Sequence, residues 1–319
     1  MKRETLRIGS YAFVPREKIG SDEWNKFADI HVDGCWWHRW EWLEYCLAYA
    51  GGTDHSMGIM LHDQLCGILP LIEESGQFKG GRNPLACALA TFQDDELAMC
   101  LTAYVHKVAQ WAKVLTGEFM VHPHASVPAN QWESLNTENI SFKTRVIDLT
   151  KPVADRKHDV RDSYKSLLNK YDCIGGADIV FPAYEQLHQG KYNMPRSQAT
   201  YDLQKSWCAS GFARVYAVPS EQSKSQLADA AALWFIYKQH AYYASAVNTG
   251  KNLAHPLMWF ALNDLARMGV QTAELGWQGL AKTEKEKNIE FWKRGWGGSD
   301  WTIVALRQYY GVQKHGGSA

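Results

Sequence analysis

The chain has 319 residues and no formal net charge, because 34 lysine and arginine residues balance 34 aspartate and glutamate residues. This balance argues against sequence-independent binding of DNA or RNA, which usually needs a basic surface. Hydrophobic residues make up 46% and charged residues 21%, so the composition excludes disordered, collagen-like and coiled-coil chains.

The N-terminal stretch, MKRETLRIGSYAFVPREK, starts with charges but lacks the apolar core of a signal peptide. No later segment offers about 18 uninterrupted apolar residues, the length that a membrane span needs. The seven cysteines are widely spaced without a CxxC pair, which is typical of free thiols in a reducing compartment. We therefore expect a cytoplasmic protein without a membrane span.

Residues 36–50 predict a helix, because apolar side chains recur there at spacings of three and four before Gly51 and Gly52. Four tryptophans lie within residues 36–42. They fit a platform on which Trp36 stacks against a base or sugar, although the periodicity favours a bulky core helix.

The segment HSMGIMLHDQLCGILPLIEE has two short apolar runs around His62, Asp63 and Gln64, and it predicts a β-hairpin. A glycine-rich loop, a strand-like run and an acidic cluster follow in GGRNPLACALATFQDDELA, before a predicted helix over 97–116. The strand VIDLT then precedes Pro152. We place a domain boundary near residue 150, giving domains 1–150 and 151–319.

Residues 155–172 and 195–210 predict helices, the second followed by the strand GFARVYAVPS. Residues 230–247 suit a helix by their alanines and a hairpin by their aromatic residues and the break KQH, and we predict the hairpin. The pattern then alternates through a helix over 256–268, the strand TAELGW, a helix over 284–294 and the strand WTIVALRQYY.

The last predicted helix has clear ends. Thr283 and Glu286 form a capping box at its start, and Gly295 predicts a left-handed cap at its end, before the chain turns sharply into the last strand.

The order AYYASAV, NTGKNLAH, PLMWFALNDLARMG, VQTAELGW, TEKEKNIEFWKRG and GWGG resembles the catalytic half of a GNAT acyltransferase, whose common ending is YxKxGF. Taken with ADAAALWFIYKQH, it resembles the Fem-like branch, in which two GNAT units stand in tandem. That branch includes peptidoglycan aminoacyl transferases and bacterial N-acyltransferases of nucleotide-linked amino sugars. The resemblance implies an α/β (α+β) fold of two GNAT-like units, each a mixed, mainly antiparallel twisted sheet flanked by helices. The first would bind the acceptor and the second the acyl donor.

The resemblance implies a donor site at the start of the helix over 256–268, where a helix N-terminus favours the pyrophosphate of acyl-CoA. The usual Q/RxxGxG/A signature is absent, and an ordinary capping loop explains the segment nearly as well. The implied cofactor-binding residues are Asn248, Thr249, Gly250, Lys251 and Asn252.

The resemblance also implies catalytic residues. Glu274 stands where Fem-like proteins carry an acidic residue, as a base or amine binder, or else as a structural partner of a basic side chain. Phe291 replaces the tyrosine that serves many GNAT enzymes as general acid, so either Tyr243 or solvent would protonate the leaving group or no acid is required. The candidate acceptor-binding residues of the first unit are Trp36, Arg82, Asn83, Phe92, Asp94 and Asp95, of which the acids also fit a solvated turn.

The sequence thus predicts an N-acyltransferase that moves an acyl group from acyl-CoA to a dTDP- or UDP-linked amino sugar of bacterial surface polysaccharide biosynthesis, by direct attack and without a metal. The alternatives are a Fem-type tRNA-dependent aminoacyl transferase, a glycosyltransferase with a divalent ion on Asp94 and Asp95, and a binding protein without catalysis. The aromatic content of 13% would suit a homodimer interface.

Overall fold

The structure is a computed structural model that describes residues 4–81, 83–91, 94–121, 136–176, 180–191, 196–220, 227–250 and 252–310. The chain divides into two compact units: unit 1 contains residues 1–141 and 303–319, and unit 2 contains residues 142–302. The chain therefore leaves unit 1 near the predicted boundary but returns to it within its last strand. A strand's own pattern does not show which sheet it joins, so this return has no signal in the sequence.

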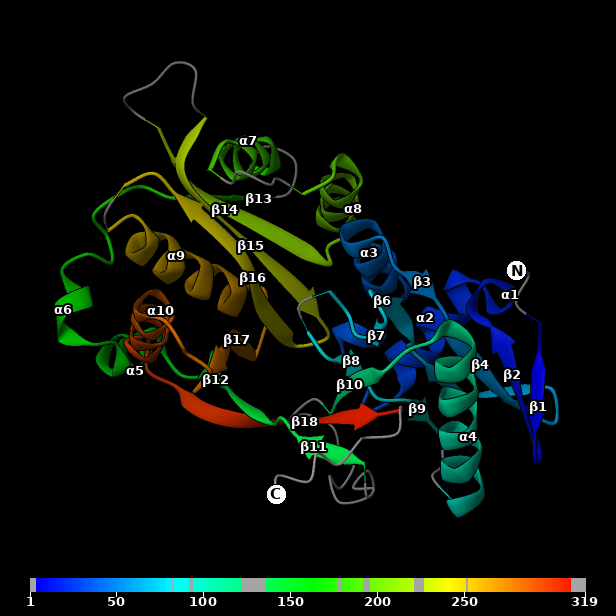
Figure 1. Cartoon of the computed structure of the whole chain (residues 1–319). Coiled ribbons are helices and arrows are strands. Elements are labelled where there is room, and N and C mark those ends of the chain that lie inside the picture. The colour runs from blue at the N-terminus through cyan, green and yellow to red at the C-terminus, as the bar shows by residue number, and fades with distance from the viewer. Residues whose placement is uncertain are drawn as a thin grey trace, which may run out of the picture. The chain divides into compact units, whose positions relative to one another are not determined.

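Unit 1 contains two sets of strands. An antiparallel sheet has the order β1-β2-β4-β5-β9, and β10 pairs with the end of β18 and with β7 and β8. Its elements are β1 (Leu6–Ile8), β2 (Tyr11–Pro15), α1 (Arg16–Ile19), α2 (Ser21–Ile30), the 3-10 turn η1 (Trp36–His38), α3 (Trp40–Ala50), β3 (Thr53–Asp54), β4 (Met57–Leu61), β5 (Gln64–Leu69), β6 (Ile72–Glu74), β7 (Gln77–Phe78), β8 (Leu85–Ala86), β9 (Leu89–Ala90), α4 (Asp95–Ala112), β10 (Thr116–Val121), β11 (Thr137–Asn139) and β18 (Ser299–Tyr309) (Figure 1).

Two local predictions in unit 1 are confirmed. The hairpin of β4 and β5 turns through His62 and Asp63, both with positive φ, as a two-residue hairpin loop requires. The helix predicted over 36–50 is confirmed as α3, Trp40–Ala50, which ends at Gly51 with a φ of +70°. Its first residues differ, because Arg39 is extended and residues 36–38 form the separate 3-10 turn η1.

Unit 2 is a single sheet of order β13-β14-β15-β16-β17-β12, antiparallel except between β16 and β17. Its elements are β12 (Phe142–Asp148), α5 (Val153–Asp159), α6 (Asp162–Lys165), β13 (Ile174–Gly176), α7 (Phe181–Lys191), α8 (Gln198–Ala209), β14 (Ala213–Pro219), β15 (Ala228–Tyr237), β16 (His240–Asn248), α9 (Ala254–Arg267), β17 (Thr272–Gln278) and α10 (Glu284–Arg294), followed by the start of β18.

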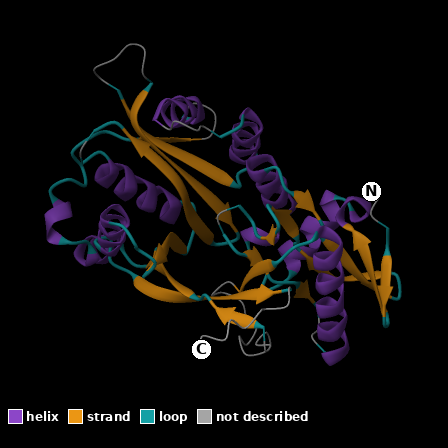
Figure 2. Ribbon diagram, viewed as in Figure 1, coloured by secondary structure: helices purple, strands orange, loops and turns teal. Residues whose placement is uncertain are grey.

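Helices cover both faces of the unit 2 sheet (Figure 2). Alternate residues of β15 point to opposite faces. Ala230, Ala232 and Trp234 pack into the core beneath α9, and Phe235 packs edge-on against Trp207 of α8. A strand buried on both faces reads as a continuous apolar run, which explains why residues 230–236 look as much like a helix as a strand. The predicted hairpin is confirmed as β15 and β16.

Two predictions in unit 2 need correction. The helix expected over 155–172 is interrupted, because Val160 is extended and buried in the core and Arg161 donates its N–H to the carbonyl oxygen of Gly295. Gly295 ends α10 as predicted, but its φ is −65°, so the left-handed cap is wrong. A Cβ at Gly295 would lie 2.2 Å from the ring of Tyr164, so close packing selects glycine there.

No helix among the described residues is long and apolar enough to cross a bilayer.

Candidate active site

Strands β16 and β17 pair for only three residues and then separate. Their parallel pairing joins residues 240–242 to residues 272–274. Beyond it, β16 continues along β15 and β17 continues along β12. Among the described residues, the facing edges of the two strands then carry backbone N–H and C=O groups that no ladder uses. Such edges suit an extended ligand that carries amide groups.

Both strands have an irregularity close to the point of separation. Ala244 is an extra residue in the register of β16 against β15. The register of β17 against β12 shifts beside Gly276, whose φ of +81° favours glycine. Because a bulge bends its strand and increases the local twist, these two bulges account for the divergence.

Two buried polar side chains, one on β17 and one on α10, lie where the strands separate. Glu274 is 7% exposed and accepts a hydrogen bond of 2.8 Å from the hydroxyl of Thr144 on β12. Lys293 of α10 is 4% exposed, and its ammonium donates to the carbonyl oxygen of Trp277 at 3.0 Å and lies 4.4 Å from the centre of the Trp277 ring. The described residues supply Lys293 with this one acceptor, so two of its three N–H donors remain for a ligand.

Burial lowers the pKa of Lys293 to about 8, and the negative charges of Glu290 and Glu274 offset part of the shift. A pKa close to neutral suits a group that holds a positive charge and also exchanges a proton. The combination of a buried cation, a buried carboxylate and free hydrogen-bond donors is typical of a catalytic site.

The sequence analysis does not single out Lys293. Its signal is its place on the apolar stripe of α10, between Trp292 and Trp296, where a surface helix rarely places a lysine. The charged run KTEKEK earlier in the helix, by contrast, is mostly exposed.

Aromatic rings adjoin this polar group. Tyr243 follows the last paired residue of β16, and its ring centre lies 5.1 Å from that of Trp234 and 6.0 Å from that of Trp292. Trp292 in turn contacts His255 at the start of α9. The predicted proton donor Tyr243 therefore stands at the separation of the strands, and its role stays a prediction.

A hollow of about 480 Å³ opens on one face of α10. The hollow is shallow and open to solvent. The ring of Trp292, the amide of Asn288 and the ammonium of Lys285 offer a stacking surface, a hydrogen-bonding group and a positive charge. It is lined by Lys285, Asn288, Ile289 and Trp292, which lie on one face of the helix at spacings of three and four.

The loop between β16 and α9 holds the predicted donor-binding residues. The N–H and hydroxyl of Thr249 both donate to the carbonyl oxygen of Asp229, Gly250 is exposed, and Asn252 has a φ of +68°. The carbonyl oxygen of Asn248 accepts from the ammonium of Lys191. Lys251 lies outside the described residues.

The N-terminus of α9 has no side-chain cap and no acidic residue in its first turn. Its first backbone N–H groups and its dipole therefore favour an anion, as the predicted pyrophosphate site requires. The binding role of the loop stays a prediction.

The candidate acceptor residues of unit 1 have structural surroundings. Trp36 has no exposed surface, so its ring offers no face to a ligand. Asp94 caps α4 through the N–H of Leu97 and accepts a hydrogen bond from the hydroxyl of Tyr11. Arg82 and Phe92 lie outside the described residues. Asn83 forms a bridge to Gly80, and Asp95 is exposed in the first turn of α4.

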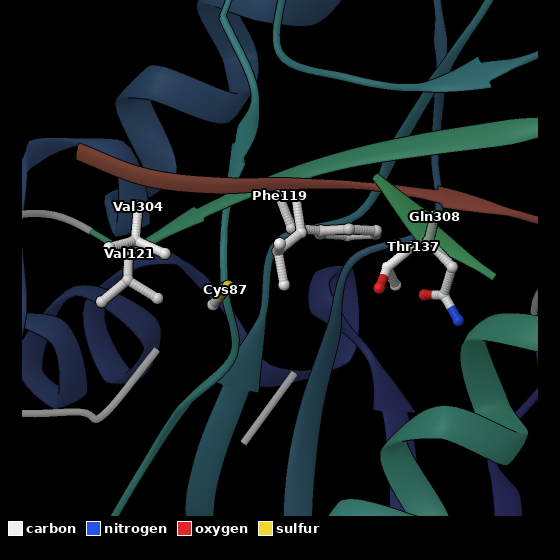
Figure 3. A pocket seen from close by; sticks show the side chains of 7 residues that line it. Cys87, Phe119, Val121, Thr137, Val304 and Gln308 are labelled. Carbon is white, nitrogen blue, oxygen red and sulfur yellow. The ribbon is translucent and has the colours of Figure 1, made fainter. Parts of the chain in front are cut away.

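A second cavity, in unit 1, is far smaller (Figure 3). Its volume of about 30 Å³ holds one water molecule, too little for a substrate. It is lined by Cys87, Phe119, Val121, Thr137, Val304, Leu306 and Gln308.

In the described part of the chain, no three His, Cys, Asp or Glu side chains are grouped as metal ligands. Asp94, one of the two acids that the glycosyltransferase alternative needs, is engaged as a helix cap.

The fold is that of tandem GNAT proteins. The chain superposes on the crystal structure of FemX with a TM-score of 0.65 and 12% identity, over 95% of this chain and 97% of that one. It superposes on a tandem GNAT protein from the clavulanic acid biosynthesis pathway with a TM-score of 0.58 and 13% identity, over 94% and 99% of the two chains. L-PGS from Bacillus licheniformis matches with a TM-score of 0.53 and 11% identity, over 84% and 91%.

No protein-family model and no curated protein matches the sequence. The predicted fold of two tandem GNAT-like units is confirmed by the solved structures.

Proposed function

We propose that this chain is an acyltransferase, in which unit 2 binds an activated acyl donor and transfers its acyl group to an amine. The observation that carries the proposal is the separation of β16 and β17 beside the buried side chains of Glu274 and Lys293. The free strand edges suit the amide-bearing arm of acyl-CoA, and the uncapped start of α9 suits its pyrophosphate.

Glu274 and Lys293 have different roles in the proposed reaction. The amine attacks the thioester carbonyl, a C–N bond forms, the C–S bond breaks, and the thiolate leaves with the electron pair. Glu274 takes the proton that the amine loses. Lys293 directs a positive charge at the developing oxyanion from a site with little water, where such a charge is most effective.

For the acceptor we propose a nucleotide-linked amino sugar, which the resemblance of residues 228–298 to sugar N-acyltransferases supports. The second candidate function is Fem-type transfer of an aminoacyl group from tRNA, which the fold-level likeness to FemX favours. Both functions need the same carbonyl chemistry at Lys293 and differ in the donor.

The first experiment is calorimetry of coenzyme A in metal-free buffer. We expect micromolar binding that weakens about tenfold in Trp292→Ala and Lys285→Ala, whose side chains line the hollow on α10. Lys287→Ala is the matched control, because Lys287 is an exposed lysine of the same helix that lies outside the hollow and pairs with Glu284.

Micromolar binding would justify screening amino-sugar nucleotides as acceptors. No binding at millimolar coenzyme A would overturn the thioester donor. Binding of an aminoacyl-tRNA analogue in its place, weakened by the same two variants, would make the second candidate the better one.

A further inference from the structure

Helix α4 in unit 1 presents an apolar face to solvent. Its exposed residues after the first turn are small or apolar except for Thr102, Lys107 and Gln110. Met99 and Trp111 are each 65% exposed. A surface helix normally places charged residues on its solvent side, so this face is suited to a partner.

The charges of α4 are segregated to its two ends. Asp94, Asp95 and Glu96 stand at the N-terminal end, while Lys107 and Lys113 stand near the C-terminal end. Asp94 and Glu96 are engaged within unit 1, but no described residue pairs with Asp95. Asp95 at one end therefore complements Lys113 at the opposite end of another helix of the same sequence.

We propose that a second copy of this chain docks on this face, with the two α4 helices antiparallel about a two-fold axis near Ala103. Such an interface is isologous, so each contact occurs twice. Counted about Ala103, Met99 faces the stem of Lys107 in the other copy, and Trp111 covers the partner's first turn. Lys113 then approaches the partner's Asp95.

Two further features favour this occupant. The small exposed residues Thr102 and Ala103 at the centre let two helices approach to about 8–10 Å. The net charge of zero gives two copies no long-range repulsion. Helix α4 has 18 residues and is about 27 Å long, so the contact is small and the dimer is expected to dissociate in the micromolar range.

Sedimentation velocity over a range of concentrations tests the proposal. The intact chain is expected to shift from monomer to dimer mass, and Met99→Glu and Trp111→Glu to remain monomeric at the highest concentration. Ile30→Glu is the matched control, because Ile30 is 74% exposed at the end of a different helix, α2, and it should dimerise normally. Circular dichroism checks that each variant is folded.

Two variants test the antiparallel register. Asp95→Lys and Lys113→Glu should each weaken the dimer about tenfold, and the double variant should restore it. Ala103→Cys, on the axis, should form an intermolecular disulfide with oxidised glutathione, and Gln110→Cys should not.

A chain that stays monomeric throughout, or an Ile30→Glu variant that dissociates as readily as Trp111→Glu, would overturn the interface. A double variant without recovery would overturn the antiparallel arrangement. The donor-binding test of unit 2 is independent of all these results.

Discussion

The two units treat their buried cations differently. In unit 1, Arg16 bonds to Asp54 and Glu44, and Arg39 bonds to Asp29 and Glu41, so each buried guanidinium has two carboxylate partners. In unit 2, Arg156 bonds to the carbonyl oxygens of Lys151 and Leu262, whereas Lys293 is equally buried but has a single carbonyl partner among the described residues. A fully paired buried charge holds a fold together, whereas an under-paired one indicates a site that awaits a ligand.

The N-termini of one long helix from each unit also differ in their charges. Helix α4 of unit 1 follows β9, and helix α9 of unit 2 follows the hairpin of β15 and β16. Helix α4 has Asp94 as its cap and two more acids in its first turn, which repel an anion. Helix α9 has neither a cap nor an acid. Only the second arrangement suits the phosphates of a donor.

Replacement of the buried cations is expected to give the largest effects, and the effects should differ between the two units. We expect Lys293→Met to lower the transfer rate at least about 100-fold while its free energy of unfolding is unchanged or higher. Arg39→Met should cost about 2 kcal/mol of stability, because it leaves Asp29 and Glu41, which are partly exposed, without their cation. Urea unfolding and a transfer assay measure the two effects. A Lys293→Met variant that unfolds more readily yet still transfers would give Lys293 a structural role.

A new charge at α9 should weaken donor binding about tenfold. Asn252→Asp places a carboxylate beside the helix N-terminus in a backbone conformation that aspartate tolerates, and it imitates the acidic start of α4. Asp94→Asn in unit 1 is the control and should bind the donor normally. Calorimetry with coenzyme A compares the two, and equal affinities would mean that α9 binds no phosphate.

The pKa of Lys293 should appear in the stability of the protein. Its pKa is about 8 in the folded chain and about 10.4 in the unfolded chain, so between these values the unfolded chain binds more protons. The free energy of unfolding therefore gains a contribution that rises with pH across this window, and the cost of burying the ammonium is complete below it. Lys293→Met should lack this rise. Parallel pH profiles of the two proteins would mean that Lys293 is not desolvated.

The smallest expected effect concerns the capped helices. Thr283→Ala removes the capping box of α10 and should cost about 1 kcal/mol, as should Asp94→Ala at α4. Thermal unfolding measures both. A much larger loss for Thr283→Ala would show that the start of α10 also positions the residues of the site.

Local signals account for what the sequence predicted well. The start of α10, the turn at His62 and Asp63, and the hairpin of β15 and β16 follow from caps, turn residues and residue types that act within a few positions. The left-handed cap predicted at Gly295 was wrong, because glycine is needed there to pack closely against Tyr164, which lies more than a hundred residues away in the chain.

The site was predicted in part for the same reason. Glu274 lies on the predicted strand, but the burial of Lys293 depends on how α10 packs against β17, which no local pattern contains. The sequence left two interpretations of Trp36 open, a stacking platform or a core residue. Its complete burial in the structure assigns it to the core.

The return of the chain to unit 1 within β18 has a consequence for synthesis on the ribosome. Residues 304–309 pair with all of β10, and they emerge only after the whole of unit 2 has been translated. Until then the edge of β10 from Thr116 to Val121 lacks this neighbour, and an unpaired strand edge is a template for aggregation. Unit 2, whose residues are contiguous, can complete its sheet first, so we expect aggregation of a nascent or truncated chain to start in unit 1.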